Sequence, residues 1–248
     1  MKLHKMKWAV VAGLFAMPFM TNAADNTGFE PIKPDALADY RLSYDEMFSI
    51  ANSHVLPHRI FYYPSVGENA EWFDAVKKGN LDKVKAMVEA GQSLEVKDTK
   101  SGRGQTALGW AAFIGYEDIV KYLIDKGADL YATDDADVKN ALKSAALGNS
   151  AATAKVIYAA LKEKQDGKVD VNYNTFDSDG ESLLMIAASN NRVDMVNYLL
   201  SIGAKIDIVS EKLQQNALTY ACSRGHQQVA DILIKNGAVN FKTGKPAC

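Results

Sequence analysis

The side chains that most often carry chemistry are scarce in this chain. The sequence holds four histidines and two cysteines among its 248 residues. His54 and His58 lie four residues apart, a spacing that places two metal ligands on one face of a helix. Pro57 stands between them and is expected to end any helix there, because proline lacks a backbone donor and clashes with the preceding turn. The sequence therefore predicts no metal site at this pair.

Other groupings of reactive side chains also fail to form a recognisable site. The aspartates near residue 130 lack the alternating order around a glycine that calcium loops require, which favours a solvated acidic tip. They are Asp129, Asp134, Asp135 and Asp137. The sequence contains no Gly-x-Ser-x-Gly, no phosphate-binding glycine loop and no His-Glu-x-x-His. We therefore predict no enzyme activity, no catalytic residue, no cofactor and no metal.

The two cysteines, Cys222 and Cys248, are too few for a disulfide scaffold or a multi-cysteine zinc site. Cys222 lies in an apolar pattern and is expected to be buried. An internal bond would require the last residue, Cys248, to reach into a packed helix layer. We expect Cys248 to be free or oxidised between molecules, and the protein to be a monomer or a dimer linked through Cys248.

Composition and charge exclude further classes of protein. Hydrophobic residues make up 48% and charged residues 23% of the chain, as in an ordinary globular protein rather than a disordered or collagen-like one. The formal net charge is −2, with 28 Lys and Arg against 30 Asp and Glu. Because nucleic-acid binders carry a basic excess, we expect no nucleic-acid partner.

The first 23 residues have the order of a secretory signal peptide. Lys2, Lys5 and Lys7 precede a mostly apolar stretch at 8–20, and small residues follow up to Ala23. A membrane span needs about 20 apolar residues, so cleavage after Ala23 is favoured over anchoring. We expect a secreted protein without an integral membrane segment, which would be periplasmic if the source is a Gram-negative bacterium.

The remainder of the chain repeats itself. A triplet made of a polar residue, then Ala or Leu, then Leu recurs at 106–108, 140–142, 182–184 and 216–218. The offsets between successive triplets are 34, 42 and 34 residues. Pairs of small residues follow at 111–112, 145–146, 187–188 and 221–222. Gly-Ala pairs close three of the copies, at 127–128, 203–204 and 237–238. Such a period indicates a stacked repeat array.

Residues 105–129 (QTALGWAAFIGYEDIVKYLIDKGAD) resemble a nearly complete ankyrin repeat, although Ala107 and Gly109 replace the family's proline and histidine. The resemblance implies an all-α solenoid of about five helix-turn-helix repeats. Thr106 is expected to cap an inner helix that Gly115 ends, and His226 to bond a neighbouring turn. The copies are placed at 66–98, 99–134, 135–172, 173–208 and 209–241, followed by a tail at 242–248.

Two regions depart from this pattern. In the third copy, Val138 stands where a turn glycine is expected, and residues 162–169 lengthen the segment that leads to the next copy. We interpret this lengthening as a surface insertion rather than as a bend or a partner-binding finger. Residues 24–65 are rich in aromatics, and Ser43 and Glu46 form a capping box at the start of a short helix. We interpret this segment as a cap on the first copy, in preference to a binding arm. Lys77 is expected to give polar cover at the same end of the array.

The resemblance also implies the function. Ankyrin repeats are mostly non-catalytic interaction modules, so we expect a protein partner. It would bind the concave face formed by the inner helices and by the projecting turns between copies, called fingers. Its role would be that of an inhibitor, an immunity protein or a scaffold. The alternatives are an enzyme or metal-dependent activity in residues 24–69, or a secreted effector that acts on a host protein. The variable positions of the family correspond here to Arg103, Gln105, Phe113, Ile114, Lys139, Leu147, Asp179, Glu181, Ser189, Asn190, Ser223 and Arg224.

Phe113 and Ile114 stand out in this set because they are apolar. If they are exposed side by side, they predict a binding hot spot. The alternative is that the exit of the third copy or the N-terminal segment folds over them.

Overall fold

A computed structural model describes residues 38–51, 61, 64–99, 104–135, 140–148, 150–172 and 180–248. All of these belong to the larger of two compact units, Ile32–Cys248. The predictions of a signal peptide at 1–23 and the interpretations of His54, His58 and Val138 lie outside the described residues.

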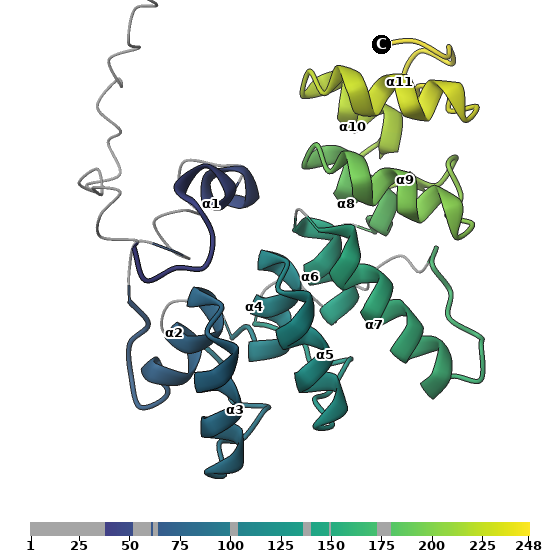
Figure 1. Cartoon of the computed structure of the whole chain (residues 1–248). Coiled ribbons are helices and arrows are strands. Elements are labelled where there is room, and N and C mark those ends of the chain that lie inside the picture. Colours follow the sequence, from purple (N-terminus) through teal and green to yellow (C-terminus); the bar gives the residue numbers. More distant parts are fainter. Residues whose placement is uncertain are drawn as a thin grey trace, which may run out of the picture. The chain divides into compact units, whose positions relative to one another are not determined.

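The described part of the chain is a series of helix pairs, which Figure 1 shows in chain order. The first helix, α1 (Tyr44–Ala51), belongs to none of the five pairs. They are α2 (Ala70–Lys78) with α3 (Leu81–Glu89), α4 (Ala107–Ile114) with α5 (Glu117–Asp125), α6 (Ala141–Leu147) with α7 (Ala151–Lys164), α8 (Leu183–Ser189) with α9 (Val193–Ser201), and α10 (Ala217–Ser223) with α11 (Gln227–Lys235). The strands β1 (Val209–Ser210) and β2 (Gln215–Asn216) pair antiparallel, with Val209 opposite Asn216.

The pairs stack in sequence order. Each first, or inner, helix packs on the next one, from α2 to α4, α6, α8 and α10, and each second, or outer, helix packs likewise from α3 to α11. The repeated small residues lie at these contacts, where Ala111, Ala112 and Ala145 are wholly buried. Because a single pair cannot bury its own apolar face, the core is continuous from copy to copy. The prediction of an all-α solenoid is confirmed.

The first residue of each repeated triplet explains why the inner helices begin where they do. Its side-chain oxygen accepts a hydrogen bond from the backbone N–H three residues later, which satisfies one of the free donors of the helix start. These caps are Thr106, Asn140, Ser182 and Asn216. Gly115 ends α4 with φ of 104°, a left-handed conformation that favours glycine. Both predictions for the second copy are confirmed.

A second device links neighbouring copies. In three copies, the residue just before the outer helix hydrogen-bonds, through its side chain, a carbonyl at the end of the previous copy's inner helix. Tyr116 Oη donates to Lys77 O, and Arg192 Nε donates to Leu147 O. His226 Nε2 lies 3.2 Å from Ser189 O, in agreement with its predicted structural role. These contacts satisfy carbonyls that a helix end otherwise leaves without a partner.

The third copy has the longest outer helix, because α7 has 14 residues where α5 has nine. The extra residues continue the helix to Lys164, and the chain then turns through Asp166 and Gly167, both at positive φ. The predicted lengthening at 162–169 is therefore in part an extension of α7.

The C-terminal tail contradicts the expectation for Cys248. A disulfide joins Cys222 and Cys248, and no cysteine in the described chain is free. The tail folds back on the last inner helix, where Phe241 N donates to Thr219 Oγ1. Cys222 is only partly buried, which leaves its sulfur within reach of the tail. The prediction of a dimer through Cys248 is therefore wrong for this oxidised form.

The N-terminal segment also differs from the expected cap. Its capping box is confirmed, because Ser43 N donates to Glu46 Oε2 and Glu46 N donates to Ser43 Oγ. The segment does not cover the first copy alone, however: α1 packs against α4 of the second copy and hydrogen-bonds Arg192 beside α9. Among the described residues, no helix has both the length and the apolar character that a bilayer span requires.

Candidate functional site

Three of the predicted binding residues, Arg103, Lys139 and Asp179, lie outside the described residues. The others fall into three groups by exposure. Phe113, Leu147, Glu181 and Asn190 are partly buried, and Ser223 and Arg224 are exposed. Gln105, Ile114 and Ser189 are 7%, 2% and 6% exposed, which contradicts the expectation that they lie on an open face.

The polar residues of the buried group are occupied inside the fold. Gln105 Nε2 donates to Ser144 Oγ at 3.1 Å, which joins the second copy to the third. Ser189 Oγ donates to Ile186 O within α8. Their side chains are thus used for internal hydrogen bonds and offer little to a partner.

Phe113 and Ile114 do not form an exposed apolar pair. Ile114 belongs to the core, and the ring of Phe113 packs edge-on against Trp110 with centroids 6.3 Å apart. Helix α1 packs on the same helix, α4. Changing both residues to serine is therefore expected to destabilise the fold rather than to leave it intact.

The end of the array beyond Arg192 presents an uncovered polar surface. Arg224 Nη1 donates to Ser189 O at 2.8 Å, and its guanidinium lies 5.7 Å from the centroid of the Tyr220 ring. Asn190 lies next to this carbonyl and donates to Ile186 O. Arg224 and Ser223 thus form an exposed polar and cationic surface at the ends of α8 and α10, beside the buried ring of Tyr220. We call it the C-terminal surface.

Sequence reasoning missed a buried ion pair at the opposite end. Lys77, expected on the surface, is 0% exposed, and its Nζ donates to Asp98 Oδ2 at 2.7 Å and to Ser65 Oγ at 2.9 Å. Trp110 Nε1 donates to the same Asp98 oxygen. Burial lowers the pKa of Lys77, although the Asp98 carboxylate acts in the opposite direction. The spacing of four residues from the apolar Phe73 was the available signal, because it places Lys77 on the buried face of α2.

Arg192 was missed as well. Its side chain is buried, and its guanidinium donates to Leu147 O at 2.9 Å, Ser49 O at 2.9 Å and Ile50 O at 2.6 Å. Burial lowers its pKa to about 10. The repeat offset gave a signal, because Arg192 precedes an outer helix at the position that His226 holds in the next copy.

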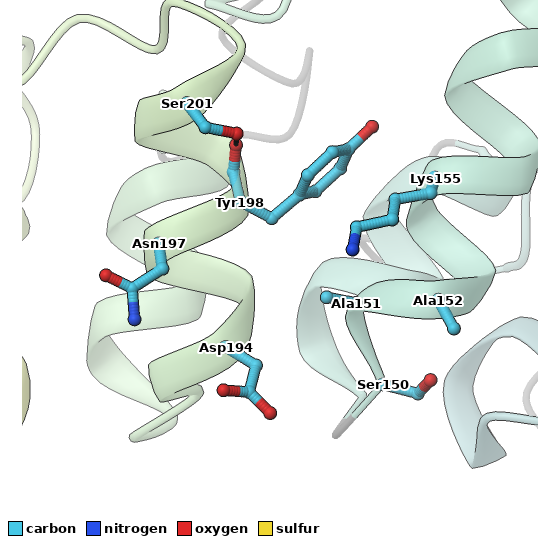
Figure 2. A pocket seen from close by; sticks show the side chains of 8 residues that line it. All are labelled: Ser150, Ala151, Ala152, Lys155, Asp194, Asn197, Tyr198 and Ser201. Carbon is cyan, nitrogen blue, oxygen red and sulfur yellow. Dashed lines mark hydrogen bonds between the residues drawn. The ribbon is translucent and has the colours of Figure 1, made fainter.

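A polar groove of about 530 Å³ lies between the outer helices α7 and α9. Figure 2 shows Tyr198 and Asp194 projecting from α9 toward α7, where the Lys155 side chain approaches the tyrosine ring. The Lys155 Nζ is 5.6 Å from the ring centroid, and burial raises the pKa of the Tyr198 hydroxyl. Ser150, Ala151, Ala152, Asn197 and Ser201 complete the lining. The groove brings together a cation, a carboxylate and hydroxyls.

Acidic side chains in the projecting turn near residue 130 contact nearby groups of the protein. Asp129 Oδ1 accepts from Tyr131 N, and Asp135 lies 3.4 Å from Lys97 Nζ. Asp137 lies outside the described residues. Within the described ranges, no group of three or more His, Cys, Asp or Glu side chains is placed to hold a metal ion.

Comparison with known proteins shows which family has this architecture. Residues 72–167 and 159–244 match the family described as ankyrin repeats (3 copies), which together is more than half of the chain. The chain belongs to the ankyrin-repeat family. It is 30% identical over 162 residues, 58% of its length, to the Ankyrin repeat and KH domain-containing protein mask-1 of Caenorhabditis elegans.

Two shorter likenesses point to the same region. Palmitoyltransferase ZDHHC13 and Palmitoyltransferase ZDHHC17 of Homo sapiens are 34% and 36% identical over 87 residues, 35% of this chain. The matches span 6% of mask-1, 14% of ZDHHC13 and 13% of ZDHHC17. Because the palmitoyltransferase likeness covers ankyrin repeats alone, it carries no enzymatic activity over to this chain. Ankyrin repeats make this protein a protein–protein interaction module, and such modules are generally non-catalytic.

Proposed function

We propose that this ankyrin-repeat protein is exported and binds a protein partner through the C-terminal surface, in an inhibitor, immunity or scaffold role. The observation that carries the proposal is the exposure of Arg224 and Ser223 beside Tyr220, while Ile114 and its neighbours are covered. Arginine is enriched among the residues that dominate binding energy at protein interfaces. The surface requires no cofactor.

Two features support export. The sequence at 1–23 has the charged, apolar and small regions of a signal peptide. The disulfide between Cys222 and Cys248 suits an oxidising compartment, because disulfides seldom persist where glutathione and thioredoxin keep thiols reduced. For a Gram-negative source, that compartment is the periplasm.

Export predicts the mass of the mature protein. We expect a chain that begins at Ala24 and carries no free thiol, because Cys222 and Cys248 are oxidised to each other. Intact mass spectrometry of the exported fraction, with and without reductant and alkylation, measures both. A mature chain that retains Met1, or two thiols that alkylate without reduction, would contradict the proposal.

Partner binding is tested at Arg224. Arg224→Ala is expected to weaken a partner captured from the exported fraction by about thirtyfold, which corresponds to the roughly 2 kcal/mol of an interface hot spot. Lys235→Ala on the exposed side of α11 is the matched control, because it also removes one exposed cation from the last copy. Titration calorimetry measures both affinities. Equal affinities for the two variants would place the binding surface elsewhere.

A further inference from the structure

Helix α1 is attached to the array in the manner of a bound ligand. Met47 and Ile50, three residues apart, are 2% and 4% exposed and belong to the core, and α1 packs on α4. Tyr44 and Phe48 lie on the other side of the helix and are 39% and 51% exposed. An amphipathic helix that lays its apolar face in a groove is a common mode of peptide recognition.

The array provides a specific contact for the carboxyl end of this helix. Two N–H groups of the buried Arg192 guanidinium donate to Ser49 O and Ile50 O, in the last turn of α1. A third donates to Leu147 O of the array itself. Cations stabilise the carboxyl ends of helices, where carbonyls lack partners within the helix. Arg192 thus joins a helix end to the array, and two of its donors are committed to α1.

Other attachments of this segment involve Arg41, outside the helix. Arg41 forms a two-bond ion pair with Asp118 at the surface, and its backbone N–H donates to Lys78 O. Helix α1 has only eight residues, too few to stay helical without its groove. Of residues 44–50 only Met47 and Ile50 are buried, and an element with few buried apolar contacts is among those that open locally before the rest of a protein unfolds.

We propose that the surface beneath α1 is a helix-binding groove, filled by α1 in the free protein and by an amphipathic helix of the partner in the complex. The partner's helix carries two apolar residues three positions apart and presents its carboxyl end to Arg192. This inference rests on the proposed function. The C-terminal surface lies close to Arg192 in the chain, because Arg192 precedes α9 and Arg224 bonds the carbonyl of Ser189 at the end of α8.

The test uses the full chain and a synthetic peptide of residues 38–51 as the probe. The double variant Met47→Asp/Ile50→Asp is expected to release α1 and to bind the peptide at least about tenfold more tightly than the wild type, because an occupied site lowers apparent affinity by the fraction that is open. Tyr44→Asp/Phe48→Asp is the matched control, since it places the same charges on the exposed side of the same helix. Fluorescence anisotropy of the labelled peptide measures binding. Equal affinity for all three proteins, or no binding to a released but folded variant, overturns the proposal.

Hydrogen exchange of the wild type keeps the proposal testable if the released variant does not fold. Amides of α1 are expected to exchange faster than those of α4 and α8, and faster still in Arg192→Gln. Equal protection of α1, α4 and α8 would show that α1 opens only with the whole fold, and would overturn the proposal. Neither measurement needs the partner, so failure here is distinct from failure of the Arg224 test.

Discussion

Replacing Ala112 with aspartate is expected to lower the free energy of unfolding by about 4 kcal/mol or more, because a carboxylate at this contact loses its hydration without gaining a partner. Ala112 is wholly buried on α4, which packs against both α2 and α6. Urea unfolding of the two proteins measures the difference. Since the copies depend on contacts with their neighbours, amide exchange should rise in α2 and α6 as well as in α4.

The control for this prediction is the same substitution at an exposed helical site. Ala159 lies on the exposed side of α7, where Ala159→Asp is expected to cost less than about 1 kcal/mol, mostly through lower helix propensity. An unchanged melting temperature for Ala112→Asp, or faster exchange confined to α4 and α5, would contradict the stacked packing described above.

Breaking the buried ion pair is the second large effect. Lys77→Met is expected to cost about 3 to 5 kcal/mol, because it leaves the Asp98 carboxylate buried without its cation. Asp98 is 2% exposed, and Trp110 is the indole donor that remains beside it. Adding Asp98→Asn removes the stranded charge and keeps an acceptor for Trp110, so the double variant should recover most of the loss. Chemical unfolding of the wild type and the three variants completes a double-mutant cycle.

The neighbouring lysine is the matched control for this pair. Lys78 contacts Asp39 at 3.4 Å in an exposed ion pair, so Lys78→Met is expected to change stability by less than about 1 kcal/mol. If Lys77→Met proved as mild as Lys78→Met, or if the double variant were no more stable than the single one, the network would not have the role that we assign to it.

The sequence by itself determined the repeat and its local geometry. A cap acts within three residues of its own position, and the caps at Thr106, Asn140 and Ser182 could therefore be inferred from side-chain type and spacing. The small pairs of the inner helices and the capping box of Ser43 and Glu46 are equally local. These features were enough to predict the all-α solenoid.

Only the tertiary structure decided which surfaces of that solenoid remain open. Ile114 is covered, and the carbonyls of Ser49 and Ile50 are bonded to a guanidinium more than 140 residues away, so no local pattern could reveal this contact. The burial of Lys77 depends on Asp98, which lies 21 residues further along the chain, between α3 and α4. The disulfide depends on the tail folding back over α10, where Cys222 is only partly buried. The physical reason is common to these cases: a repeat pattern records the contacts that every copy makes, whereas the open surfaces depend on what the two flanking segments cover.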